Sequence, residues 1–177
     1  MIRLTAALLM LLAGAARAET GVDTLLTTLA TALDERAAFA IEQQVQAAWL
    51  AAVSPAPRLL LTRAAKELAE GDASAAADMF DAVLDLTPDA EPAWRGRAQA
   101  RMRLGDPAGA MRDLQEALRR ESRDFAALQD LSRLAEARQD WRGALSAWQL
   151  VLKVDPRTPG GQRRLQDLRR RALGEAL

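Results

Sequence analysis

The sequence predicts an all-α solenoid built from three consecutive helix-turn-helix repeats. Three observations support this fold class. Ala and Leu dominate the 177 residues and aromatic residues make up only 4%, a composition that favours helices over strands. The sequence falls into register with itself when it is shifted by 34 residues, which is typical of repeat proteins. Outside the repeats, apolar residues recur at helical spacing.

Residues 1–18 have the three parts of a secretory signal peptide. A positive start at Arg3 precedes an apolar run over 4–16, and an A-x-A cleavage motif ends at Ala18. The apolar run is too short to span the ~30 Å of bilayer hydrocarbon, which disfavours an uncleaved membrane anchor as the alternative. We therefore expect Sec-type export, cleavage after Ala18 and a periplasmic chain that begins at Glu19. The absence of cysteine agrees with an oxidising compartment.

Residues 19–56 are predicted to form an N-terminal helical segment that ends in a proline-rich linker. Asp34 lies between two apolar stripes and is a plausible N-cap for the second helix. We expect this hairpin to cover the open apolar end of the solenoid, and a dimerisation helix is the alternative. The stripes consist of Val22, Leu25, Leu26, Leu29 and Leu33, and of Phe39, Ile41, Val45, Ala48, Trp49 and Ala52.

The 34-residue repeat covers residues 57–90, 91–124 and 125–158 without a gap. The eighth and twentieth positions are small, so the two helices of a unit can approach closely, and the twenty-fourth is large. Gly-Asp at positions fifteen and sixteen of the first two units predicts a tight turn, in which Asp caps the second helix. The third unit has Gln-Asp there and lacks this glycine. The three sets are Ala64, Ala98 and Ser132; Ala76, Ala110 and Ala144; and Phe80, Leu114 and Trp148.

This spacing resembles the tetratricopeptide repeat (TPR), and the layout is similar to small exported TPR proteins of Gram-negative bacteria. The resemblance implies a right-handed superhelical solenoid in which the first helix of each unit lines a concave groove. Some positions depart from the family pattern. Arg63 and Arg97 stand at the seventh position, which is usually leucine, and Glu67 and Arg101 stand at the eleventh, which is usually aromatic.

Residues 159–177 are predicted to form a C-terminal capping helix. Leu165, Leu168 and Ala172 share one face, and arginines occupy most of the rest. A solenoid needs a terminal helix whose outer face is polar, and this segment meets that need. Contact of the arginines with an anionic membrane is the alternative.

Charge is strongly segregated along the chain. Residues 19–93 carry 4 basic and 13 acidic side chains, a net charge of −9, whereas residues 94–177 carry 18 basic and 11 acidic side chains, a net charge of +7. Such asymmetry can reflect a polarised surface. An exported chain that is not basic overall is a poor candidate for nucleic-acid binding.

The residue types present exclude most catalytic chemistry. The chain has no Cys and no His, which rules out zinc–thiolate sites, haem ligation and histidine-based triads. The serines have no histidine partner, and no glycine-rich phosphate loop is present. We therefore expect no enzyme activity, no cofactor and no metal.

The TPR resemblance also implies which residues face the concave groove. In the second unit these include Arg95, Gln99 and Arg103, which share one helix face because they are spaced by four. Gln129 and Arg133 continue the same surface in the third unit. Arg and Gln suit carboxylates and exposed peptide backbone. The chain has no Asn, so the Lys/Asn carboxylate clamp of some TPR proteins cannot exist here.

The first unit places Leu61 and Leu68 at groove positions, which predicts an apolar end to the groove. The sequence thus favours a periplasmic adaptor that binds a protein or peptide partner within an envelope complex. One alternative is a peptidoglycan- or polysaccharide-associated module that uses Arg95, Arg103 and Trp141. Another is an accessory factor in cytochrome c or outer-membrane assembly. Nothing in the sequence predicts the oligomeric state.

Overall fold

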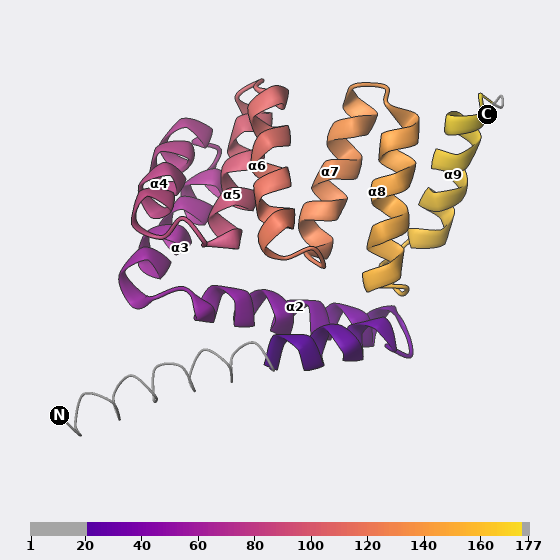
Figure 1. Cartoon of the computed structure of the whole chain (residues 1–177), viewed down its shortest axis with the longest axis horizontal. Helices are drawn as coiled ribbons and strands as arrows, with labels where there is room; N and C mark the ends of the chain where they lie inside the picture. Colours follow the sequence, from indigo (N-terminus) through magenta and orange to yellow (C-terminus); the bar gives the residue numbers. More distant parts are fainter. Residues whose placement is uncertain (1–20, 175–177) are drawn as a thin grey trace.

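The computed structural model describes residues 21–174, and every regular element in that part of the chain is an α-helix (Figure 1). The predicted all-α solenoid is confirmed. The signal peptide expected over residues 1–18 lies outside the described residues. The helices are residues 21–30, Glu35–Ala52 (α2), Pro55–Glu70 (α3), Ala73–Leu86 (α4), Glu91–Arg103 (α5), Pro107–Arg120 (α6), Phe125–Ala137 (α7), Trp141–Val154 (α8) and Gly161–Leu173 (α9).

Helices α3 to α8 form three helical hairpins, and α5 and α7 begin at the first residues of the second and third repeats. The turns within the hairpins follow the predicted chemistry. Asp72, Asp106 and Asp140 each accept a hydrogen bond from a backbone amide in the first turn of the next helix, at 2.8–2.9 Å. The residue before each Asp has a positive φ: 99° at Gly71, 78° at Gly105 and 59° at Gln139. The third turn therefore keeps its shape without glycine.

The small positions of the repeat lie where the two helices of each hairpin meet. The residues at the eighth and twentieth positions, such as Ala64 and Ala110, are all 0% exposed. The large residues Phe80, Leu114 and Trp148 are buried beside them. Gly96 shows how close the packing is between consecutive units, since a Cβ there would lie 2.3 Å from the Phe80 ring. The predicted repeat phase therefore matches the observed core.

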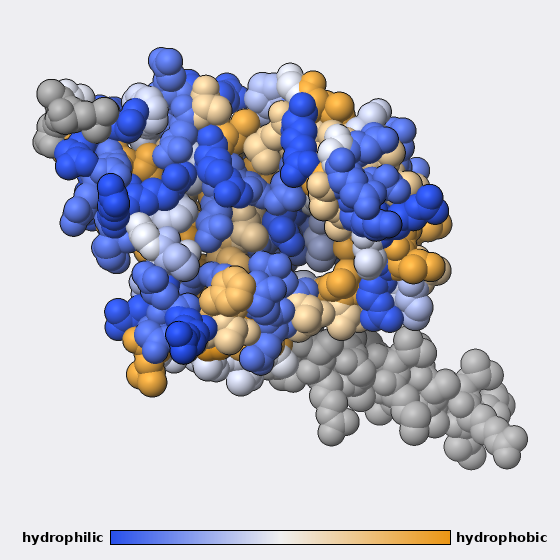
Figure 2. All heavy atoms as spheres, turned by 180° about the vertical axis from the view of Figure 1, so that it is seen from behind, coloured by the Kyte–Doolittle hydropathy of each residue, from blue (hydrophilic) through white to orange (hydrophobic). Residues whose placement is uncertain are grey.

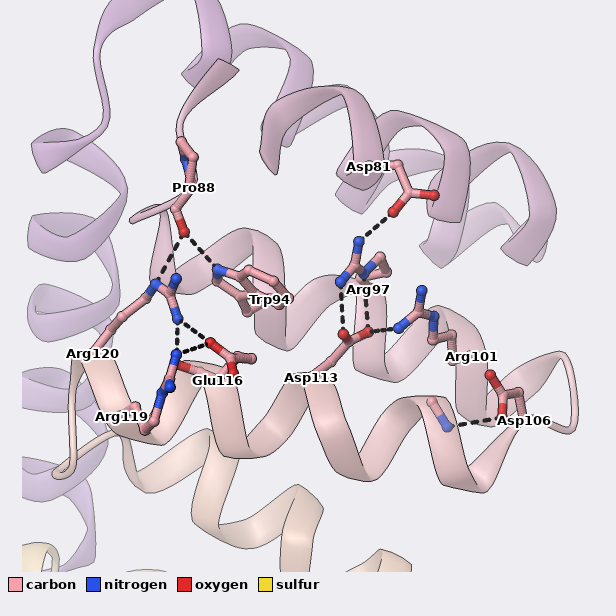
Figure 3. A network of polar contacts seen from close by, with 11 residues as sticks. Asp81, Pro88, Trp94, Arg97, Arg101, Asp106, Asp113, Glu116, Arg119 and Arg120 are labelled. Carbon is pink, nitrogen blue, oxygen red and sulfur yellow. Dashed lines mark hydrogen bonds and ion pairs between the residues drawn. The ribbon is translucent and has the colours of Figure 1, made fainter. Parts of the chain in front are cut away.

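The second unit contains a polar cluster in place of part of its apolar core (Figure 3). Asp113 on α6 is 1% exposed and accepts hydrogen bonds from two arginines of α5. Arg97 binds it through two nitrogens, at 3.0 and 2.7 Å, and Arg101 through one, at 2.7 Å. Arg97 also pairs with Asp81 on α4. The departures from the TPR pattern at Arg97 and Arg101 are thus explained by a buried carboxylate on the facing helix.

The N-terminal hairpin lies along the solenoid, which corrects the prediction that it covers the open end. Figure 1 shows α2 running along one side of the solenoid, past several units. Leu29, Val45 and Trp49 are buried in one cluster with Phe125, the first residue of α7. The rings of Trp49 and Phe125 are 5.8 Å apart. The end of the hairpin, over residues 50–53, packs against the core of the first unit.

At the other end of the solenoid, α9 packs against α8 and buries Leu165 and Leu168. The indole nitrogen of Trp148 donates a hydrogen bond of 2.9 Å to the carbonyl of Gly161, which fixes the start of α9. Two arginines of α9 also lie over tryptophan rings of α8, Arg164 over Trp148 and Arg171 over Trp141. The terminal helix is thereby held by both apolar and cation–π contacts.

Candidate functional site

Arg95, the first of the predicted groove residues, is engaged inside the protein. Its Nε lies 3.3 Å from a carboxylate oxygen of Asp124, which is 0% exposed, and 3.8 Å from the carboxylate of Glu91. Burial opposes the charge of Arg95, but the carboxylates of Asp124, Glu91 and Asp130 raise its pKa above the ordinary value. Arg95 therefore neutralises a buried acidic cluster at the junction of the second and third units.

The carboxyl group of Glu91 belongs to the same cluster. Burial raises its pKa well above the ordinary value, and the neighbouring carboxyl of Asp124 raises it further, while Arg95 lowers it. Asp124 in turn accepts hydrogen bonds from the backbone amides of Ala126 and Ala127, and so caps α7. The cluster thus joins the start of α5 to the start of α7.

Gln99 and Arg103 also have partners within the chain. The Gln99 amide donates a 2.8 Å hydrogen bond to Asp130, which is 1% exposed and sits on α7. Arg103 donates to the backbone carbonyl of Leu68 at the end of α3. Together with Arg95, these residues connect consecutive first helices. Arg95 and Gln99 are half-buried in these contacts, whereas Arg103 remains exposed. Their role in partner binding stays a prediction.

The expected apolar end of the groove is not exposed. Leu61 and Leu68 are 6% and 5% exposed and belong to the core between the first and second units. The physical reason is that the first helices pack closely enough for these side chains to be covered by α5, where Ala93 and Ala100 lie in the same cluster. The groove surface of the first unit therefore offers little apolar area.

A hollow of about 270 Å³ remains at the third unit, and it contains the other two predicted residues. The Gln129 amide donates a 3.3 Å hydrogen bond to the hydroxyl of Thr158 on its wall. Arg133 pairs with Asp130 but its side chain is 59% exposed. The hollow lies among α2, α7 and the start of α9, and its lining residues are Phe39, Glu42, Gln129, Arg133, Trp148, Thr158, Pro159 and Arg164.

Helix α2 contributes an aromatic and an acidic side chain to this hollow. Phe39 is 56% exposed, so its ring is available to a ligand. Burial, and after it the adjacent carboxyl of Asp155, raise the pKa of Glu42 from 4.5 to about 7. Glu42 is therefore largely protonated below neutral pH and becomes negative above it. Two cations, Arg133 and Arg164, line the same hollow.

The repeat pattern could not reveal Phe39, Glu42 or Thr158 as members of the site. Phe39 and Glu42 lie on α2, outside the repeats, and reach the hollow only because α2 crosses the third unit. Thr158 is the last residue of the third unit and is 5% exposed. The arrangement offers hydrogen-bond donors, a guanidinium and an apolar ring. In the described part of the chain, no cluster of acidic residues is suited to hold a metal ion.

No protein-family model matches the chain. A TPR repeat-containing protein of Rhizobium etli is 26% identical over 153 residues, which are 86% of this chain and 75% of that protein. Tetratricopeptide repeat protein 36 of Bos taurus is 46% identical over 48 residues, which are 27% of this chain and 26% of that protein.

Solved structures with the same fold are TPR domains. The first TPR domain of human RPAP3 aligns with a TM-score of 0.62 at 20% identity, over 67% of this chain and 93% of that domain. The first TPR of Spaghetti (RPAP3), bound to the HSP90 peptide SRMEEVD, aligns with a TM-score of 0.63 at 22% identity, over 67% and 96%. The Sgt2 TPR domain of Aspergillus fumigatus aligns with a TM-score of 0.61 at 20% identity, over 66% and 79%. These likenesses show the fold.

Proposed function

We propose that this chain, a tetratricopeptide repeat protein, is a non-enzymatic adaptor that binds a protein or peptide partner at the hollow of its third unit. TPR proteins mediate protein–protein interaction, and one solved relative in fold holds an HSP90 peptide. Because that relative is only 22% identical, its peptide does not identify the partner of this chain. The proposal therefore relies on the surface of this chain.

The observation that carries the proposal is the composition of the hollow. It combines an exposed ring at Phe39 with the guanidinium of Arg133 and the amide of Gln129. An apolar ring can hold a partner's apolar side chain, while the guanidinium and the amide bind carboxylates or peptide carbonyls. This set suits a peptide segment that carries an apolar residue next to an acidic residue or a chain end.

We further propose that the adaptor works in the periplasm, within an envelope complex. The support is the signal-peptide pattern of residues 1–18 and the absence of cysteine. None of the helices over residues 21–174 is long and apolar enough to cross a membrane.

Geometry favours a protein partner over a glycan. The glycan alternative depended on Arg95, Arg103 and the ring of Trp141. Arg95 and Arg103 are bound to partners within the chain, as described above. The guanidinium of Arg171 lies 4.8 Å from the centre of the Trp141 ring. Because that face of the ring is occupied, it cannot stack on a sugar without moving Arg171.

Crosslinked pull-down from periplasm followed by mass spectrometry tests the proposal. We expect one partner to be enriched with the wild-type chain and lost with Phe39→Ser or Arg133→Glu. Arg133→Glu can disturb its partner Asp130, whereas Phe39 is 56% exposed. Phe39→Ser should therefore leave the fold intact. The matched control is Arg112→Glu, an exposed arginine on α6 away from the hollow. Equal capture by wild type and folded Phe39→Ser would place the binding surface elsewhere.

A further inference from the structure

The segregation of charge along the sequence becomes a separation of charge between the two ends of the molecule. Residues 54–90, which contain α3 and α4, carry three basic and seven acidic side chains, a net charge of −4. Residues 156–174, which contain α9, carry six basic and one acidic, a net charge of +5. Figure 1 shows α4 and α9 at opposite ends of the row of helices. Nothing in the adaptor function requires this arrangement.

The exposed charges at the two ends have the same spacing. Asp78 and Asp85 are seven residues apart on α4, and both are exposed with no ion pair among the described residues. Arg163 and Arg170 are seven residues apart on α9 and both are exposed, and Arg170 also pairs with Asp167 on the same helix. Seven residues are two helical turns, or roughly 10.5 Å of rise, so each pair lies on one face of its helix. The two pairs can therefore meet without a change in either helix.

Both ends also expose a leucine beside the charges. Leu86, the last residue of α4, is 68% exposed, and Leu173, the last residue of α9, is 73% exposed. Figure 2, which shows the molecule from behind, has mainly hydrophilic residues over the surface, with hydrophobic residues in small groups between them. An apolar residue next to a charged face adds area that contact with a second molecule would bury.

We propose that the acidic face of α4 binds the basic face of α9 on a second copy of this chain. Asp78 and Asp85 of one copy would pair with Arg163 and Arg170 of the next. The two faces are different surfaces, so the contact is heterologous and leaves a free acidic face and a free basic face on every assembly. Copies then add head to tail. Because the contact is formed by exposed ion pairs, association is weak and depends strongly on salt.

Exchanging the charges provides a direct test. One variant carries Asp78→Arg and Asp85→Arg, and the other carries Arg163→Glu and Arg170→Glu. Each variant has two ends of like charge and should not associate with itself. Mixed in equal amounts, they restore both complementary contacts and should associate like the wild type. The control variant is Arg112→Glu, which changes the net charge at an exposed position on α6.

Sedimentation velocity over a range of concentrations reads out the association. We expect the sedimentation coefficient of the wild type and the control to rise with concentration at about 0.05 M salt, and to lose that rise near 1 M salt. We expect each charge-exchanged variant to stay monomeric and the mixture to regain the rise. Circular dichroism checks that each variant is folded. A wild type that stays monomeric at low salt, a dimer that stops growing, or folded variants that still self-associate would each overturn the proposal.

Discussion

At the scale of single residues, Asp113 holds the second unit together through two arginines of the facing helix. Its carboxylate is 1% exposed and binds both Arg97 and Arg101. Asp113→Ala should lower the free energy of unfolding by about 3–5 kcal/mol, because it leaves two guanidiniums in a half-buried site without their shared acid. Urea denaturation followed by circular dichroism measures this change.

Arg112→Ala, one residue earlier on α6, is the control for this prediction. Its side chain is exposed and should change stability by less than about 0.5 kcal/mol. A similar effect of both substitutions would mean that the arginine–aspartate cluster contributes little to folding.

Glu42 should make the stability of the chain depend on pH near neutrality. Its pKa is about 7 in the folded protein and ordinarily 4.5, so the folded state holds the proton more tightly than the unfolded state. The contribution of Glu42 to the free energy of unfolding is therefore fully present below about pH 4.5 and is lost as pH rises to about 7. Glu42→Gln, which cannot ionise, should be more stable than wild type at pH 8 by roughly 1–2 kcal/mol, and equal to it near pH 4.5.

Thermal melts at pH 4.5 and pH 8 measure this difference. Glu35→Gln is the matched control, because Glu35 lies on the same helix but is exposed. Glu35→Gln should leave the difference in melting temperature between pH 4.5 and pH 8 the same as in wild type. A wild type and Glu42→Gln that respond identically to pH would show that Glu42 titrates normally.

At the scale of the helices, the small twentieth position decides how closely a hairpin can pack. Ala110 is 0% exposed and lies in a cluster with Leu114 and Ala127. Ala110→Leu should cost roughly 1–3 kcal/mol of stability, because three more carbons must enter a filled space. A melting temperature equal to that of wild type would contradict the assigned repeat phase.

The helices themselves were largely predictable. The 34-residue periodicity recurs along the chain, and the capping chemistry of three aspartates is a local signal. Asp72, Asp106 and Asp140 all cap helices in the structure. The Gln139 turn was less obvious, because the family pattern has glycine there. The aspartate cap and the hydrogen bond from Asp140 N to Ala135 O are retained in that turn.

At the scale of the whole molecule, the prediction of export comes from the sequence of residues 1–18. The exported chain should begin at Glu19, because small residues at positions 16 and 18 fit the signal peptidase. Mass analysis of the protein purified from whole cells measures its N-terminus. The control is a chain with Ala18→Leu, which should be processed poorly. Recovery of wild type with Met1 intact would contradict the periplasmic proposal.

The amino-acid pattern alone predicts the fold class, the number of repeats and the turns between their helices. These follow from spacing, small residues and caps, all of which act over a few residues or recur at a constant interval. The departure of Arg97 and Arg101 from the family pattern was visible in the sequence. Their partner Asp113 was not, because a pairing between helices depends on which faces meet.

The position of α2, and with it the set of predicted site residues open to a partner, depends on how the helices pack. The apolar stripe of α2 shows that it must be buried, yet that pattern is the same whether it covers an end or a side. The structure places it along the third unit, where Trp49 meets Phe125. That placement adds Phe39 to the hollow. Similarly, spacing puts Arg95 and Gln99 on one face of their helix. Only packing shows that two buried carboxylates bind them, Asp124 binding Arg95 and Asp130 binding Gln99.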